Sequence, residues 1–381
     1  MRVEQNLAYP RKKASELSNI PWTKPAAGTE YYQRRLTERL EFSATAKANY
    51  KKYLIWKNSN DPKAKVDFTP IAGHISPNSQ CNFKCTMCSV SDFERGKRCE
   101  DMSTEIFEKR LNQLPGLLEI SLVGLSELFM MNESLEDMLR MCVERKLWTK
   151  ISTNASLLHQ RNWINRIVSL NLDEITISID GTTKKVFESI RRKSNFDKVI
   201  QNSRSLNDAL KNFGVSPSRT KMVTVLQSEN RDQLFDFVPF AKKLGFTSLA
   251  FETEPFDWGS ASWRERNSKV SLILEPENVV RLVNQGEEHG VEVGFVEIVQ
   301  RFSTQPKEHS LCSWPFSKIF ISSDDRVVPC CHISNPDHFE IGKGIGETKS
   351  VSDVWFGEDY DNFRQAHISG NIPSACSSCY K

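Results

Sequence analysis

Three cysteines stand close together early in the chain, at positions 81, 85 and 88, with the spacing C-x3-C-x2-C. Thiolate ligands select zinc or iron–sulfur clusters. A structural zinc ion takes four ligands, usually from two short pairs, whereas this stretch supplies three and no histidine. Three thiolates on a four-iron cluster leave one iron open to a substrate or cofactor. The spacing therefore favours a reactive cluster over a structural zinc site.

A second group of cysteines comprises Cys312, Cys330, Cys376 and Cys379. Four thiolates would fill every position of a second cluster or of one zinc ion, so the residues alone leave both possibilities open. The neighbouring Cys331 could replace Cys330 as a ligand. The first 15 residues contain no apolar stretch of signal-peptide length, and ten cysteines gathered mainly in two groups favour metal over disulfides.

The elements that must position these cysteines form a regular series from about residue 70. Repeated strand–helix units favour parallel strands with right-handed crossovers, and a partial (β/α)6 barrel would place its chemistry at the carboxyl ends of the strands. The pattern alone also allows a doubly wound open sheet. We expect strands at 71–75, 119–123, 149–152, 174–179, 221–226, 248–252 and 291–296, and helices at 104–114, 133–146, 157–169, 183–190, 197–212, 231–243 and 276–288.

The segments on either side break this rhythm, so we divide the α/β chain into three domains, at 1–68, 69–300 and 301–381. The first is a mostly helical extension, charged between Glu30 and Lys57, for which a solvated cap and a substrate-recognition element are both open. The last is a small domain with short strands at 318–321 and 326–328. It is too poor in apolar residues to fold readily without a bound metal centre.

The amino-acid composition argues against nucleic acid and membrane as partners. The 51 basic and 48 acidic residues nearly cancel, which gives no electrostatic case for nucleic acid. No run of 18 apolar residues is present, so we expect no membrane-spanning helix. A cytoplasmic location is the default expectation.

The loop from Cys81 to Cys88 resembles that of the radical S-adenosylmethionine superfamily, in which C-x3-C-x2-C holds a [4Fe–4S] cluster. The resemblance implies that the open iron binds the amine and carboxylate of S-adenosylmethionine. Reduction of the cluster would then yield a 5′-deoxyadenosyl radical, which abstracts a hydrogen atom from substrate. An external reductant such as flavodoxin or ferredoxin is implied. Met87 stands where the family keeps an apolar residue near the adenine.

A turn after the second strand resembles the family's Gly-Gly-Glu-Pro-like turn, which binds the cofactor's amine. Here it is Gly124-Leu-Ser126-Glu127-Leu, without one glycine and without the proline. That departure puts individual backbone contacts of Gly124 and Ser126 in doubt. Glu127 keeps a carboxylate for the ammonium group.

Polar residues at two later strand ends also resemble cofactor-binding motifs of the family. Ser152-Thr-Asn154 is similar to Thr-Asn-Gly, and Ser178-Ile-Asp180-Gly is similar to Ser-hydrophobic-Asp-Gly. Arg191 takes an Ile-Arg position, and a guanidinium suits a carboxylate partner. An ordinary strand-end cap is the alternative for these residues. The resemblance covers about residues 70–300.

The C-terminal segment resembles the SPASM/twitch type of auxiliary-cluster domain. The turn that precedes Cys330 has the family's spacing, which favours Cys330 over Cys331 as a ligand. Additional cysteines for a second auxiliary cluster are absent, so one auxiliary [4Fe–4S] cluster is implied. The resemblance rests on Cys312-Ser-Trp-Pro315, Val-Val-Pro-Cys330-Cys331, Ile341-Gly, Val354-Trp355 with Arg364, and Cys376-x2-Cys379.

The family resemblance allows more than one activity. The first hypothesis is oxidation or epimerisation of a small polyol, sugar or aminocyclitol, because one auxiliary cluster could accept the second electron of a redox reaction. One alternative is a maturase acting on a ribosomally made peptide, and another is a non-catalytic zinc-binding interaction protein. Cys99 could donate a hydrogen atom, as in radical epimerases. Glu252, Glu254 and Asp257 follow a late strand and could bind a cationic or hydroxylated substrate, or cap the strand.

Overall fold

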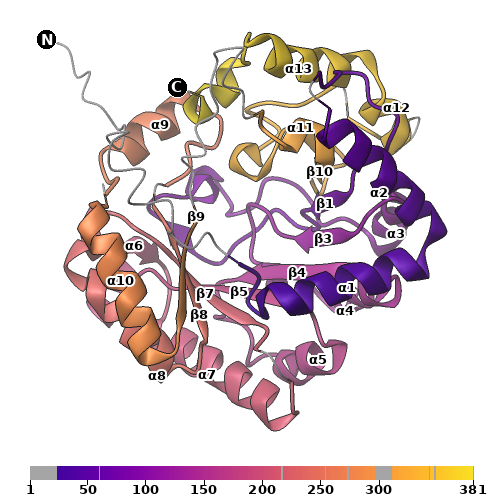
Figure 1. The fold of residues 1–381 in the computed structure, drawn as a ribbon. Coiled ribbons are helices and arrows are strands. Elements are labelled where there is room, and N and C mark those ends of the chain that lie inside the picture. Colours follow the sequence, from indigo (N-terminus) through magenta and orange to yellow (C-terminus); the bar gives the residue numbers. More distant parts are fainter. Residues whose placement is uncertain are drawn as a thin grey trace, which may run out of the picture.

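A single curled sheet forms the centre of the protein (Figure 1). The computed structural model describes residues 24–59, 61–215, 218–253, 255–272, 274–296, 311–342, 344–346 and 349–380. The nine strands of the central sheet lie in the order β11-β10-β1-β3-β4-β5-β7-β8-β9. They are β1 Ala72–Ile75, β3 Glu119–Leu122, β4 Trp148–Thr153, β5 Glu174–Ser178, β7 Thr220–Val225, β8 Ser248–Glu252, β9 Glu292–Val296, β10 Lys318–Ile321 and β11 Val327–Val328.

The strands from β1 to β9 follow one another in chain order and pair in parallel. A doubly wound sheet would reverse its strand order at a switch point, and this sheet does not. The prediction of a partial barrel is therefore confirmed. The connecting helices are α3 Thr104–Asn112, α4 Ser134–Glu144, α5 Trp163–Leu170, α6 Lys184–Ile190, α7 Phe196–Asn212, α8 Phe237–Lys243 and α10 Pro276–His289, with α9 Ala261–Ser268 in the β8–α10 connection.

Alternation along the strands separates the apolar layer from the barrel interior. Ile120, Ile151 and Ile175 have no exposed surface, whereas Ser121 and Lys150, on the other face of their strands, keep part of theirs. Because side chains alternate across a strand, the isoleucines pack outward against the helices. The polar side chains point into the barrel.

The C-terminal segment is not a separate layer. Strand β10 pairs in parallel with β1, aligning Lys318 with Ala72, and β11 pairs with β10 in antiparallel fashion. The hairpin expected in the small domain thus extends the barrel sheet. The helices α11 Trp314–Ser317, α12 Val351–Trp355 and α13 Glu358–Ser369 pack beside this edge (Figure 1).

The described part of the extension contains two helices, α1 Gly28–Phe42 and α2 Ala44–Lys57, because Ser43 is extended and caps α2. Helix α1 covers the amino ends of the strands. Tyr31 and Arg35 bind Asp173 just before β5, at 3.0 and 2.7 Å, and Arg39 donates to the Leu117 carbonyl just before β3. The described part of the extension is therefore a cap at the end opposite the strands' carboxyl ends.

Other differences from the expected elements have local causes. Helix α5 begins at Trp163 rather than 157, because Arg161 and Asn162 take positive φ values of 47° and 58°. The expected helix 231–243 is a 3-10 helix, η3 Ser228–Asp236, followed by α8. Pro239 lies in the first turn of α8, where a missing N–H costs no helical hydrogen bond.

Candidate active site at the carboxyl ends of the strands

The loop that carries the first three cysteines is held on two sides. Its short strand β2, Lys84–Cys85, pairs with β6, Arg191–Arg192, and the Thr86 amide donates to the Ile190 carbonyl at 2.9 Å. On the other side the Cys81 amide donates to the Gly96 carbonyl at 3.1 Å. Backbone hydrogen bonds therefore position the thiols independently of any bound group.

The three thiols and the strand ends line one cavity of about 220 Å³. Most of the predicted cofactor-binding residues are on its wall, although their roles there stay predictions. They are Met87, Gly124, Ser126, Glu127, Ser152, Asn154, Ser178 and Arg191. The carboxyl ends of parallel strands meet at one edge, which explains why residues so far apart in the sequence converge.

Glu127 is almost fully buried on this wall, at 1% exposure. Its carboxylate accepts from Thr153 Oγ1 at 2.7 Å, the Asn154 amide at 2.6 Å and the Phe129 amide at 3.3 Å. Burial raises the pKa of this carboxyl. A carboxylate has about four acceptor positions, so one remains for a donor in the cavity.

We expect Glu127→Gln to weaken S-adenosylmethionine binding by about 1.5–3 kcal/mol, the range for a hydrogen bond to a charged group. Glutamine would also place its amide N–H opposite the Thr153, Asn154 and Phe129 donors that now bind the carboxylate. The melting temperature should therefore fall. Equilibrium titration and thermal melting check the two effects separately. Glu133→Gln, at an exposed carboxylate, is the matched control. A lower melting temperature with unchanged affinity would assign Glu127 to structure alone.

Two neighbours of Glu127 also fit a polar ligand. A Cβ atom at Gly124 would overlap the Ser76 side chain, so only glycine permits this close approach of the β1 and β3 ends. The Ser126 hydroxyl is buried and has no hydrogen-bond partner among the described residues. Buried hydroxyl groups normally have a partner, so a ligand in this cavity would supply the missing one.

The structure corrects the expectation that Asp180 contacts the cofactor. Asp180 is completely buried and is not on the cavity wall. Its carboxylate lies 2.7 Å from Arg191 Nε and accepts from the Val225 amide at 2.8 Å. Asp180 is thus a positioning residue that holds Arg191 against the cluster loop.

The thiols themselves suit a metal cluster. Burial raises the pKa values of Cys81, Cys85 and Cys88, that of Cys88 to about 12. Free thiols here would stay protonated at neutral pH, and a metal would hold them as thiolates. Among the residues that the structure describes, no three His, Cys, Asp or Glu side chains are arranged to hold a single metal ion. A four-iron cluster instead takes each thiolate on a different iron.

The C-terminal cysteines converge as well. Burial, followed by the thiols of Cys331, Cys376, Cys312 and Cys379, raises the pKa of Cys330. The side chain of Cys331 responds to other groups, because Lys318 lowers and Glu252 raises its pKa after the larger effect of burial. Cys331 is also close to this group, because after burial its thiol raises the pKa values of Cys330 and Cys312, so the choice of Cys330 as the fourth ligand stays a prediction.

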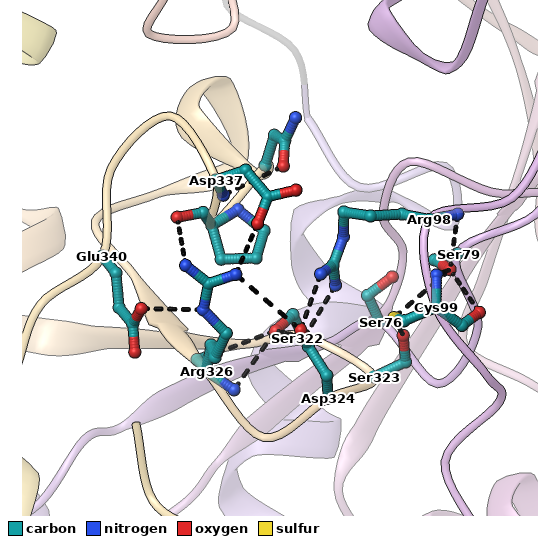
Figure 2. Close-up of polar contacts among 12 residues, drawn as sticks. Ser76, Ser79, Arg98, Cys99, Ser322, Ser323, Asp324, Arg326, Asp337 and Glu340 are labelled. Carbon is teal, nitrogen blue, oxygen red and sulfur yellow. Dashed lines mark hydrogen bonds and ion pairs between the residues drawn. The ribbon is translucent and has the colours of Figure 1, made fainter. Parts of the chain in front are cut away.

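Cys99 does not line the cavity, which corrects its expected role as a hydrogen donor. Its thiol lies 3.1 Å from the Ser323 hydroxyl and 3.4 Å from that of Ser79 (Figure 2). The adjacent Arg98 forms a bidentate pair with Asp324, both distances being 2.6 Å (Figure 2). Cys99 therefore belongs to a polar junction between the cluster loop and the β10–β11 turn.

The three acids predicted at and after the end of β8 lie in different surroundings. Glu252 lies on the cavity wall, and burial raises its pKa to about 7. Asp257 is not on the wall. It accepts from the Gly259 amide and from Arg264 Nε, both at 3.0 Å, as a loop-stabilising residue does. Glu254 lies outside the described residues.

Sequence reasoning named the acids of the loop that follows Glu252 but missed the contacts of its other residues. Trp258 Nε1 and Asn267 Nδ2 donate to the Met87 carbonyl at 2.9 and 3.2 Å, and Phe256 stacks on His332 with ring centroids 4.2 Å apart. This loop joins the cluster loop to the C-terminal segment. The aromatic pair in Phe256-Asp-Trp258 was the available signal.

The family model of the radical SAM superfamily matches residues 75–241, and that of the iron–sulfur cluster-binding domain SPASM matches residues 312–380. A GTP 3′,8-cyclase of Chlorobaculum tepidum is 25% identical over an alignment of 272 positions, and the alignment covers 68% of this chain and 77% of the cyclase. No helix among the described residues is long and apolar enough to cross a membrane.

Two solved structures share the fold. SuiB of Streptococcus suis bound to S-adenosylmethionine is 19% identical, with a TM-score of 0.57 over 78% of this chain and 68% of SuiB. The structure of anSMEcpe with bound AdoMet is 17% identical, with a TM-score of 0.54 over 78% of this chain and 81% of that one.

Proposed function

Because this chain is a radical SAM enzyme with a C-terminal SPASM domain, we propose that it dehydrogenates a small hydroxylated substrate and that Glu252 takes the hydroxyl proton. The observation that carries the proposal is the position of Glu252. It is a buried carboxylate on the wall of the cavity that the three cluster cysteines line.

The residues present fit the cofactors of the family. Cys81, Cys85 and Cys88 would hold the catalytic [4Fe–4S] cluster, and Ser126, Glu127 and Arg191 would hold the amine and carboxylate of S-adenosylmethionine. Cys312, Cys330, Cys376 and Cys379 would hold one auxiliary cluster. When bound, these groups supply a 5′-deoxyadenosyl radical that removes a hydrogen atom and an acceptor for one electron. A reductant such as flavodoxin or ferredoxin would start the reaction.

Glu252 is suited to accept the proton of the substrate hydroxyl. Burial and then Asp180 raise its pKa to about 7, against the weaker opposing effects of Arg191 and Lys150. No donor among the described residues binds its carboxylate, so both oxygens are available to a substrate. Loss of a hydrogen atom from carbon, a proton from the hydroxyl to Glu252, and one electron converts an alcohol to a carbonyl. A carboxyl with a pKa near the working pH is well matched to such a transfer.

We expect substrate oxidation to rise with pH through about 7, because only the ionised Glu252 accepts a proton. Glu252→Gln should abolish this rise and lower kcat by roughly 10²–10⁴-fold, the usual contribution of general acid–base catalysis. Glu288→Gln, at an exposed position on α10, is the control. Rates are measured with an alcohol selected from a panel of polyols, sugars and aminocyclitols.

Folding stability should change in the opposite direction. Between about pH 4.5 and 7 the folded protein retains a proton on Glu252 that the unfolded chain releases, so stability falls as pH rises through this window. Thermal melts of the wild type and of Glu252→Gln over that range test the assignment without turnover. A Glu252→Gln protein with full kcat and an unchanged pH profile would refute the proposed role.

Solvent deuterium separates dehydrogenation from epimerisation. An epimerase returns a hydrogen atom to the carbon, so its product formed in D2O carries deuterium there when the donor is an exchangeable group. Dehydrogenation yields a carbonyl with no new C–H bond. Deuterated product, or turnover of peptides with none of the alcohols, would replace the proposal by epimerisation or by peptide modification.

A further inference from the structure

A row of polar side chains crosses the barrel interior below the cofactor cavity. Strand register aligns His74 of β1 with Ser121 of β3, and Ser121 with Lys150 of β4. All three keep part of their surface exposed although the barrel surrounds them. They therefore line internal space. Ser152, which is on the cavity wall, lies two residues beyond Lys150 on the same face of β4, about 7 Å along the strand.

Not every polar atom of this row has a hydrogen-bond partner among the described residues. His74 Nδ1 is buried without a hydrogen-bond partner among the described residues. Burial, then Lys318 and Lys150, lowers the pKa of His74, so the ring is neutral at pH 7. Lys150 keeps 37% of its side chain exposed while its ammonium lies 2.9 Å from Glu174. The Glu174 carboxylate also lies 3.6 Å from the Lys221 ammonium, so one carboxylate faces two ammonium groups.

Lys318 adds a cation without an acidic partner. Its ammonium lies 5.1 Å from the centre of the Trp314 ring, and no carboxylate of the described residues is within 4.0 Å of it. Trp314 in turn contacts His74 edge-on, with ring centroids 4.7 Å apart. An ammonium group inside a fold normally has an anionic or polar partner. Here the described residues supply an aromatic face, and the thiols of Cys312 and Cys331 lie near enough for Lys318 to lower their pKa values against the larger effect of burial.

The same compartment continues to the proposed reaction centre. Ser152 and Glu252 line one cavity, and Lys150 lies two residues from Ser152 on the same face of β4, so the row of polar side chains leads toward Glu252. Glu252 ends β8 on the cavity wall, whereas Lys318 begins β10 at the amino end of the sheet. Along the barrel axis, Glu252 therefore lies near the cofactor cavity, whereas Lys318 lies toward the amino ends of the strands.

We propose that Lys318, Lys150 and His74 form an oxyanion site for the substrate. The substrate class is then a small alcohol that also carries a carboxylate or phosphate group. The anionic group lies between Lys318 and the His74–Ser121–Lys150 row, and the carbinol carbon reaches toward Glu252. This inference rests on the proposed function for the reacting end and on the lysines for the anionic end.

Calorimetric titration of the reconstituted enzyme loaded with S-adenosylmethionine tests the site without turnover. The probes are glycerol, glycerate and glycerol 3-phosphate, which share one carbon skeleton and differ in their anionic group. We expect one or both anions to bind at least about tenfold more tightly than glycerol, as one charge-assisted hydrogen bond provides. The stronger anion identifies carboxylate or phosphate as the natural group.

Variants assign the binding to these residues. Lys318→Met should weaken binding of the preferred anion about tenfold, Lys318→Arg should retain it, and Lys242→Met, exposed on α8, should leave it unchanged. Lys150→Met provides a second variant if Lys318→Met is unstable. Affinity for S-adenosylmethionine should be constant throughout.

Equal affinities for the three probes, no binding of either anion, or an unchanged affinity in both methionine variants would overturn the oxyanion site. Because these are binding measurements, they stay valid if Glu252→Gln proves fully active. Conversely, loss of turnover in Glu252→Gln with no anion preference would retain the proposed function and remove the substrate class.

Discussion

Cys85→Ala is expected to abolish reductive cleavage of S-adenosylmethionine and to lower iron by about four atoms per chain, the content of one four-iron cluster. Cys85 belongs to β2, and its backbone pairs with Arg191. The hydrogen bonds of Cys85 use its backbone atoms, which alanine retains, so the fold should survive. The effect therefore comes from the lost thiolate. The same result is expected for Cys81→Ala and Cys88→Ala.

The measurement is 5′-deoxyadenosine formed under dithionite, with iron and sulfide determined in the same preparation. Cys142→Ala is the matched control, because this thiol is completely buried in α4 and faces the apolar core. That control should lose about 1 kcal/mol of stability and keep both iron and cleavage. Formation of 5′-deoxyadenosine by any of the three loop variants would show that the catalytic cluster is held elsewhere.

The double variant Cys376→Ala, Cys379→Ala should also lose about four iron atoms, together with all substrate oxidation, while uncoupled 5′-deoxyadenosine formation persists. Both cysteines lie in the 3-10 helix η5, Ser374–Cys379, close to Cys312 and Cys330. A cluster shared by these residues closes a long loop, so its loss should loosen the C-terminal segment. Limited proteolysis of the last helix measures that loosening.

Cys331→Ala separates the two adjacent thiols. Because the family's spacing favours Cys330 over Cys331 as the ligand, this variant should keep its iron. Cys330→Ala should lose it. Full substrate turnover by the Cys376→Ala, Cys379→Ala protein would exclude the auxiliary site both as electron acceptor and as structural support. It would also remove the electron acceptor that the proposed oxidation uses.

Zinc in place of iron would favour the non-catalytic interaction protein. One or two zinc atoms per chain, without sulfide, fit structural tetrahedral sites, whereas two four-iron clusters need about eight of each element. The same metal analysis therefore serves both cysteine experiments.

Several site residues were predictable because their signal is short-range. The three cysteines of the first loop lie within eight positions of one another, and alternating strands and helices place them after a first strand. Strand ends of a parallel sheet meet at one edge. That rule alone brings Glu127, Ser152, Asn154 and Ser178 to the same cavity, without any knowledge of how the side chains pack.

The misplaced residues depend on contacts that sequence spacing does not encode. Asp180 and Ser178 are two positions apart, yet one is behind Arg191 and the other lines the cavity. Cys99 follows the cluster loop closely, but Ser79 and Ser323 hold its thiol in the junction with the β10–β11 turn. Side-chain direction at such loop positions is set by partners from distant segments.

By itself, the sequence determined the fold class, the cysteine groups and the end of the barrel where chemistry occurs, since periodicity and ligand spacing are local properties. Only the tertiary structure decided that β10 joins the barrel sheet and that α1 covers the opposite end. The reason is that the pairing of β10 with β1 and the contacts of α1 join segments far apart in the sequence. Such pairing is stabilised by buried area and hydrogen bonds that exist only once the chain has folded.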